Sequence, residues 1–440
     1  MKNRRKGSLL IMVLLILFVA ILFASASIYS VVALNNLYKN ENEVMKENIA
    51  ITSLINEWDN ITVLGDKMSN ERRDYSNSFN GEIALGKTKF DYLNKNSKIR
   101  KYLIFEAKVE DTNERKSNEK IAYKPVPLFN YSHFVINPDE ELGNANIIEE
   151  NYGIVRANKE NNNFTNITGN CIKDSGKPYI YMQNVDVEKY ALLAENYGFD
   201  FNTSYLNTTI DIYFYKNNTF RVFPENNIYN IKENAVICFR NNNLPIRIVG
   251  IDETTNLYSS IQLNFNITFV SDSPIFLESD IINLDKLLMI STAKDDVFPA
   301  ISFNINKYID HKLYPDKINI DLSSIYCGTA NGITDFDEIN TVILNGIFFT
   351  PNGSFGILEN TYSDASYNND CKNNYWIRGG IIEYNVNYPL KKFEILPSNI
   401  TNILIQRSDN LLNINSYDEF DFIAPPISKN IFIFNKKYFM

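Results

Sequence analysis

The sequence predicts a mostly β protein with one long N-terminal α-helix. Two observations support this fold class. Between residues 8 and 64 there is no glycine and no proline, the residues that most often break helices. From about residue 127 onward, short runs rich in Ile, Val, Phe and Tyr alternate with turns of Asn, Asp and Gly, which is typical of many short strands.

The first 38 residues have the charge pattern of a membrane-inserted segment. Lys2, Arg4, Arg5 and Lys6 form a basic leader, and residues 8–38 carry no charge. About 20 apolar residues are enough to cross a bilayer. The positive-inside rule predicts a cytoplasmic N-terminus with the bulk of the chain outside. The residues expected in the membrane include Leu9, Leu10, Ile11, Met12, Leu14, Phe18 and Phe23.

A secretory signal is the alternative for this segment. Such a signal has an apolar region of about 7–15 residues that ends at a small-residue cleavage site. Ala24-Ser25-Ala26 has the composition of such a site, but the apolar run resumes directly after it with Ile28 and Tyr29. We therefore expect an uncleaved helix through this point.

The part of the helix beyond the membrane carries an apolar stripe. Leu37, Val44, Ile51 and Trp58 recur every seven residues, and Ile55 joins the same face. A helix over residues 8–64 would be about 85 Å long at 1.5 Å per residue. We expect the stripe to pack against protein, either neighbouring subunits or the globular domain of the same chain.

The stretch from Arg4 to Ile11, "RRKGSLLI", resembles the leader of type IV pilin-like proteins. The resemblance implies removal of residues 1–7 after Gly7, with Ser8 as the new N-terminus. The glutamate that the family carries at the fifth mature position is absent, because Met12 stands there. Some minor pilins and the tip pseudopilin of type II secretion systems share that departure. The resemblance thus implies a minor or tip subunit, and a plain membrane anchor is the alternative.

Charge and cysteine usage exclude two classes of function. The net charge is -9 and no basic patch follows the N-terminus, which argues against nucleic-acid binding. The four cysteines form no CxxC pair, so no zinc site is predicted, and no cofactor is expected. Cys327 and Cys371 are the candidate disulfide, with buried thiols as the alternative.

The rest of the chain divides into two parts. Residues 65–126 are predicted to be a connector or small subdomain that contains the strand "KYLIFEAKVE". Residues 127–440 are predicted to form a β-rich extracellular domain, in which "EKYALLAENYGF" is a helical exception. Its predicted strands include "IDIYFYKN", "TFRVFP", "NAVICFR", "PIRIVGI", "SIQLNFNITFV", "PIFLESDIINL", "LLMIST", "TVILNGIFFT", "RGGIIEYNV" and "NIFIFN".

Three similar fragments indicate a parallel β-helix. "YGIV" (152–155), "NGIF" (345–348) and "GGII" (379–382) each place glycine where a turn would lead into an apolar strand. The run "ILNGIFFTPNGSFGI" resembles rungs of the strand-rich solenoid domains found on some minor-pilin-like surface proteins. A β-sandwich or an α/β pilin-like head is the alternative fold.

Catalytic motifs are not evident in the sequence. His133 and His311 are its two histidines, and His133 is expected to be a packed or surface residue rather than a general base. Paired carboxylates, and the group at residues 335–338 that could hold calcium, are expected to be solvated loops. The predicted function is a non-enzymatic minor pilin-like subunit of a type IV pilus or type II secretion-like filament. Its expected partners are the membrane, other pilin-like subunits and a surface ligand or glycan. A membrane-anchored adhesin and a β-helix enzyme acting on polysaccharide are the alternatives.

Overall fold

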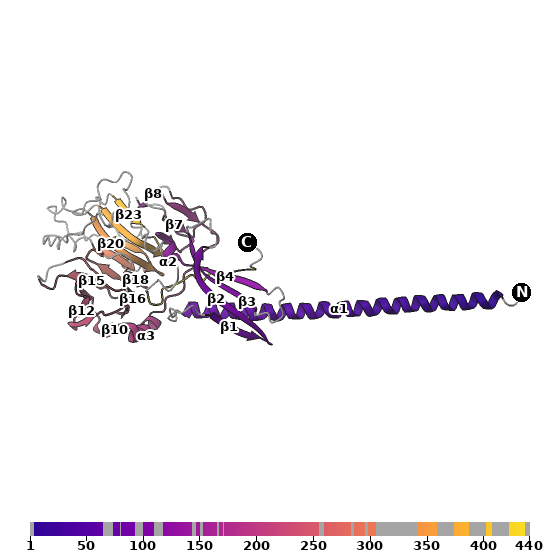
Figure 1. Ribbon diagram of the computed structural model, residues 1–440. Helices are drawn as coiled ribbons and strands as arrows, with labels where there is room; N and C mark the ends of the chain where they lie inside the picture. The colour runs from indigo at the N-terminus through magenta and orange to yellow at the C-terminus, as the bar shows by residue number, and fades with distance from the viewer. Residues whose placement is uncertain are drawn as a thin grey trace.

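A long N-terminal helix, α1 (Arg4–Leu64), projects from a body built largely of β-strands (Figure 1). This computed structural model describes residues 4–64, 74–79, 81–92, 100–109, 118–142, 147–149, 153–164, 167–169, 171–254, 259–282, 286–294, 298–304, 341–358, 374–386, 402–406 and 422–435. The prediction of a mostly β protein with one long N-terminal helix is confirmed.

Helix α1 runs through 61 residues without interruption. It continues past Ala24-Ser25-Ala26 and past residue 38, where the charged residues begin. At 1.5 Å per residue its length is about 90 Å. The absence of glycine and proline, together with abundant Leu and Ala, favours this continuity.

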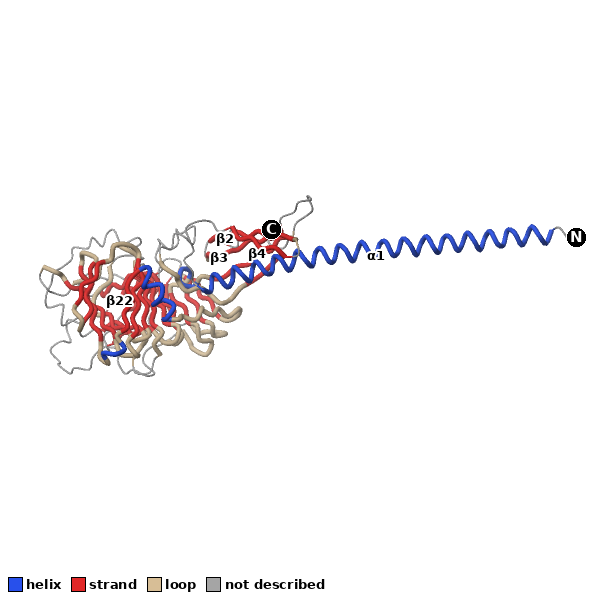
Figure 2. Tube along the Cα trace, turned by 90° about the horizontal axis from the view of Figure 1, so that it is seen from below, coloured by secondary structure: helices blue, strands red, loops and turns tan. Residues whose placement is uncertain are grey.

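An antiparallel sheet lies beside the C-terminal end of α1 (Figure 2). Residues 65–126, predicted to be a connector or small subdomain, supply four of its strands. The fifth, β24, comes from the far end of the chain and pairs with β4. Its strand order is β1 (Asp74–Phe79), β2 (Glu82–Tyr92), β3 (Lys101–Val109), β4 (Glu119–Pro125) and β24 (Phe432–Asn435).

Two further sheets, largely parallel, make up the rest of the body. The 12-stranded sheet contains β10 (Gly198–Asn202), β14 (Ala235–Arg240), β16 (Ile267–Ser271), β18 (Leu287–Ser291), β20 (Thr341–Thr350), β22 (Asn374–Glu383), β23 (Asn402–Gln406), β6 (Ile147–Glu149) and β8 (Ile167–Gly169), with β5 (His133–Val135), β7 (Ile154–Ala157) and β9 (Ile172–Ser175) continuing from β22. The 7-stranded sheet contains β13 (Asn227–Asn230), β12 (Thr219–Phe223), β11 (Ile210–Tyr215), β15 (Ile246–Ile251), β17 (Ile275–Leu277), β19 (Ile301–Asn304) and β21 (Phe355–Leu358).

The chain alternates between these two sheets. From β14 to β22 each successive described strand joins the other sheet, and from β16 onward each pairs in parallel with the strand two before it. Two short helices, α2 (Pro127–Asn130) and α3 (Val187–Tyr197), and the 3-10 turn η1 (Ser204–Leu206) accompany the strands. The helix predicted in "EKYALLAENYGF" is confirmed as α3.

Both faces of β14, a strand of the larger sheet, are buried. In β14, Ile237 and Phe239 face the apolar core between the two sheets, whereas Val236 and Cys238 belong to a second core that includes α3. Burial on both faces explains why this strand reads "AVICF" instead of alternating with polar residues. The second core continues without a break into the end of α1, so the helix and the sheets share one apolar interior.

Two of the three glycine fragments occupy a different place from the one predicted. Gly346 lies inside β20 and Gly379 inside β22, where the two residues pair directly, so neither begins a strand at a turn. Gly379 has φ +132°, and a Cβ atom there would lie 2.1 Å from the carbonyl oxygen of Gly346. Close approach of the two backbones, rather than a turn, requires glycine here. Gly153 directly precedes β7, as expected.

Two predicted strands are shorter than the sequence indicated. Only the second half of "SIQLNFNITFV" forms β16. In the first half, the backbone amide of Asn264 donates to the Asn218 side chain and that of Asn266 donates to the Asn234 side chain, so these amides bond to side chains and not to a neighbouring strand. In "PIFLESDIINL", β17 ends at Leu277.

Candidate membrane and assembly helix

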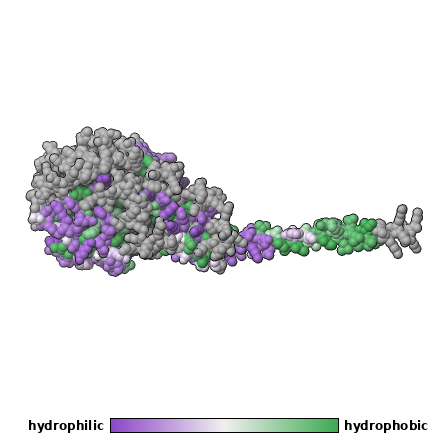
Figure 3. All heavy atoms as spheres, viewed as in Figure 1, coloured by the Kyte–Doolittle hydropathy of each residue, from purple (hydrophilic) through white to green (hydrophobic). Residues whose placement is uncertain are grey.

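The N-terminal half of α1 is an exposed apolar rod. The seven residues named above as expected in the membrane, between Leu9 and Phe23, have exposed fractions of 57–72%. Figure 3 shows this part of the helix as a continuous hydrophobic surface standing clear of the body. By length and composition the helix could cross a membrane, and it is equally compatible with a signal segment. Gly7 and Ser8 lie inside α1, which starts before the predicted cleavage point.

Three serines in the apolar half have their hydroxyl groups satisfied within the helix. Ser25, Ser27 and Ser30 donate to the carbonyl oxygens of Ile21, Phe23 and Ala26 at 2.8, 2.8 and 2.9 Å. A hydroxyl bonded to the preceding turn needs no water, which suits a low-dielectric environment.

The predicted packing stripe divides between two environments. Ile51, Ile55 and Trp58 are completely buried, whereas Leu37 and Val44 are 57% and 48% exposed. The buried part packs against the antiparallel sheet of the same chain. Only the part from Leu37 to Val44 is therefore available to another molecule.

Trp58 is the centre of the contact between α1 and the sheet. Its ring stacks on Phe105 of β3 with centroids 5.0 Å apart and planes 9° apart. The Phe105 ring in turn lies over Gly86 of β2, where a Cβ atom would approach the ring to 2.0 Å. The glycine provides the room that lets the helix lie close to the sheet.

A buried lysine joins α1 to β4. The ammonium group of Lys124 forms an ion pair with Asp59, donates to the Thr62 hydroxyl at 2.9 Å, and lies 5.6 Å from the centroid of the Trp58 ring. Burial lowers the pKa of Lys124, and the hydrogen bond to Asp59 opposes that change. The Asp59 carboxylate and the Thr62 hydroxyl both belong to the last turns of α1. Their bonds to Lys124 therefore hold this end of the helix against the sheet.

Two amide side chains fix the helix further out. Asn77 donates to the Ser53 hydroxyl at 2.7 Å, and Asn118 donates to a Glu47 carboxylate oxygen at 2.6 Å. These bonds reach α1 from both edges of its contact with the sheet. Sequence reasoning identified none of these polar contacts, because they join residues far apart in the chain.

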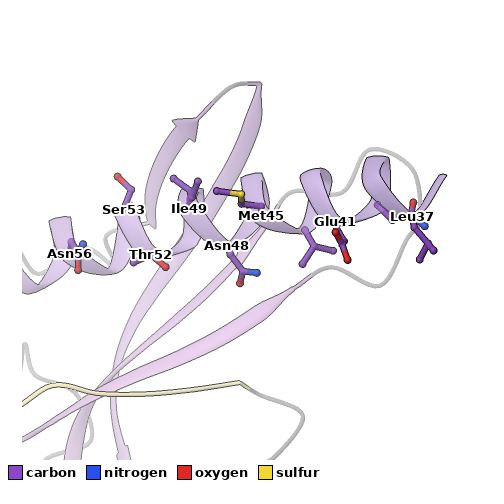
Figure 4. A pocket seen from close by; sticks show the side chains of 10 residues that line it. Leu37, Glu41, Met45, Asn48, Ile49, Thr52, Ser53 and Asn56 are labelled. Carbon is purple, nitrogen blue, oxygen red and sulfur yellow. The ribbon is translucent and has the colours of Figure 1, made fainter. Parts of the chain in front are cut away.

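A shallow hollow follows α1 where the helix leaves the sheet (Figure 4). Its volume is about 750 Å³, and the lining residues in the described part of the chain belong to the helix, from Leu37 to Asn56. The exposed end of the apolar stripe, Leu37 and Val44, lies in it beside polar residues such as Asn48 and Thr52. This mixed surface is the transition between the apolar rod and the part of α1 held by the body.

The residues considered for chemistry have structural partners or lie outside the described chain. His133 is buried in β5 with its Nε2 2.7 Å from Glu383 Oε1, and Glu383 also accepts from the Phe355 amide at 2.9 Å. It is a packed histidine. Arg247 bridges Asp211 and Glu278, and the hydrogen bond to Glu278 raises the pKa of Arg247.

No group of three or more His, Cys, Asp or Glu that could hold a metal ion occurs in the described ranges. Cys238 is a buried thiol, and burial raises its pKa to about 12. Cys327, Cys371, His311 and residues 335–338 lie outside the described residues, so the candidate disulfide stays a prediction.

The comparisons with known proteins add no relative. No protein-family model matches the chain, and no curated protein or solved structure matches it either.

Proposed function

We propose that this chain is a non-enzymatic, minor pilin-like subunit of a type IV pilus or type II secretion-like filament. The observation that supports this most is the division of α1 into two halves. The first half is an unbroken apolar rod without a partner in the described body, and the last turns pack over an antiparallel sheet. Such a helix can leave a bilayer and enter a filament without refolding, because the body contacts only its C-terminal turns.

The basic leader supports an orientation for this rod. Lys2, Arg4, Arg5 and Lys6 would remain in the cytoplasm, and the sheets would be displayed outside the membrane, at the cell surface or on a pilus. The rod would be held by its apolar surface in the lipid before assembly.

The displayed part would be a parallel β-helix built on the pilin-like base. Its support is the regular alternation of strands between two sheets, with parallel pairing from β14 to β22 and a continuous apolar core between the sheets. Stacked coils that each add one strand to each sheet would produce this pairing.

The mature N-terminus tests the proposal directly. We expect the protein isolated from its own cells to begin at Ser8 and to occur in sheared surface filaments. In Gly7→Leu the leader should be retained and the protein should be lost from filaments, because processing requires glycine there. Ala26→Leu, which blocks the alternative site, is the matched control and should behave like the wild type.

Other outcomes would contradict the pilin-like assignment. An intact leader in the wild type would indicate a plain membrane anchor that displays an adhesin. A start at Ser27 that is abolished in Ala26→Leu would indicate a secreted protein.

A further inference from the structure

A polar groove lies on the body, away from α1. Its volume is about 580 Å³, within the range of ligand sites. One wall is formed by Tyr181 to Val185 together with Lys429 and Asn430, and the other by Pro351, Asn352 and Tyr384. A second hollow of about 330 Å³ shares Gln183, Asn184, Val185 and Lys429 with it, so the two form one continuous groove.

The backbone of the first wall is already hydrogen-bonded. The Gln183 amide donates to the Ile427 carbonyl at 2.9 Å, and the Lys429 amide donates to the Tyr181 carbonyl at 2.7 Å. Asn430 completes this wall by accepting from the Tyr181 amide at 2.7 Å and donating to the Tyr179 carbonyl at 2.9 Å.

The opposite wall is equally fixed. The Tyr384 amide donates to the carbonyl oxygens of Thr350 and Gly353 at 2.9 and 3.0 Å, and the Asn352 side chain donates to the Thr292 carbonyl at 3.0 Å. Several main-chain groups of each wall are thus already hydrogen-bonded within the protein. A ligand would meet side chains, which disfavours an extended peptide that pairs as an added strand.

The side chains in the groove suit a sugar. Gln183, Asn184 and Asn352 contribute amides, each with a donor and an acceptor that can match neighbouring hydroxyl groups. Tyr181 and Tyr384 are 41% and 38% exposed, and stand in the two opposite walls. A tyrosine ring offers an apolar face with a polar tip, the surface that a pyranose ring contacts well.

The charge in the groove favours an acidic sugar. Lys429 donates to the side-chain carbonyl oxygen of Asn184, a neutral group, at 2.6 Å. The adjoining hollow adds Lys189 and one carboxylate, Asp186, which caps α3 by accepting from the Glu188 amide at 3.1 Å. Among the described residues that line the larger hollow, Lys429 is the one that carries a charge.

We propose that this groove binds an oligosaccharide that contains an acidic sugar. The sugar carboxylate would lie against Lys429, and adjacent rings would lie between Tyr181 and Tyr384. The site does not depend on how α1 is processed or assembled, so it would exist in an anchored protein as well as in a filament subunit.

Binding to defined tetrasaccharides by the detergent-solubilised full chain tests this site. The probes are tetragalacturonate and a hyaluronan tetrasaccharide, each beside its uncharged methyl ester. We expect at least one acid form to bind, and its ester to bind about tenfold more weakly. Tyr384→Ala should weaken binding at least tenfold, and Lys429→Met should bring acid and ester to equal affinity. Tyr205→Ala and Lys232→Met, exposed residues outside the groove, are the controls and should leave affinity unchanged.

Three results would overturn the proposal. The first is that neither acidic tetrasaccharide binds to the folded wild type. The second is that binding occurs but both groove variants, with wild-type near-ultraviolet circular dichroism, retain full affinity. The third is that tetraglutamate binds as tightly as the sugars with the same dependence on Tyr384 and Lys429, which would assign the groove to acidic peptides.

Discussion

At the scale of single residues, Trp58 joins the helix to the body. It is fully buried, stacks on Phe105, and lies below the ammonium group of Lys124. Leu37 belongs to the same heptad stripe but is 57% exposed. Trp58 and Leu37 therefore mark the buried part and the exposed part of the same helix face.

Replacing Trp58 should destabilise the body, whereas replacing Leu37 should not. Trp58→Ala leaves a cavity against Phe105, and we expect a loss of about 3–5 kcal/mol in the free energy of unfolding. Leu37→Ala is the matched control, with an expected change within about 0.5 kcal/mol. Urea unfolding followed by near-ultraviolet circular dichroism measures both. Equal losses would mean that the stripe is supported along its whole length.

At the scale of elements, the contact between β20 and β22 depends on glycine. Gly379 has φ +132° and no room for a Cβ atom, since the Gly346 carbonyl oxygen would lie 2.1 Å away. Gly81 also has a positive φ, +89°, but nothing lies within 4 Å of its Cβ position. A side chain at either position would have to adopt a positive φ, but at Gly379 it would also collide with the neighbouring strand.

The two glycines give a matched pair of variants. Gly81→Ala should cost about 1–2 kcal/mol, the strain of a left-handed residue. Gly379→Ala should cost about 1–3 kcal/mol more, because the methyl group must push the two strands apart. Thermal unfolding of both variants checks the difference. A loss in Gly379→Ala no greater than in Gly81→Ala would show that β20 and β22 separate easily.

Local patterns predicted the elements better than their pairing. The helix α1, the helix α3 and strands such as β3 and β14 could be read from composition and periodicity within one short window. The return of β24 to pair with β4, the ion pair of Lys124 with Asp59, and the polar groove join segments distant in the chain. A local sequence pattern does not predict such contacts, because each residue taken alone is an ordinary residue for a surface position or a strand.

At the scale of the whole molecule, the two ends of α1 lie in different environments. Its last turns complete the core of the body through Ala50, Ile51, Leu54, Ile55 and Trp58, all fully buried. Burial of each large apolar side chain contributes about 1.5–3 kcal/mol. Their sum is comparable to the total stability of an ordinary domain, about 5–15 kcal/mol. The body thus needs the end of the helix, and the beginning of the helix is left for another environment.

Truncation at two points tests this division. A chain of residues 46–440 lacks the exposed apolar half but keeps the buried turns, so we expect it to purify without detergent and to unfold at the same urea concentration as the full chain. A chain of residues 74–440 loses the buried turns as well and exposes Phe105 and the apolar face of the sheet. We expect it to aggregate or to remain unfolded. Aggregation of the longer chain would contradict the division, since it would show that residues before 46 support the body. A stable fold of the shorter chain would contradict it from the other side, because the body would then be complete without α1.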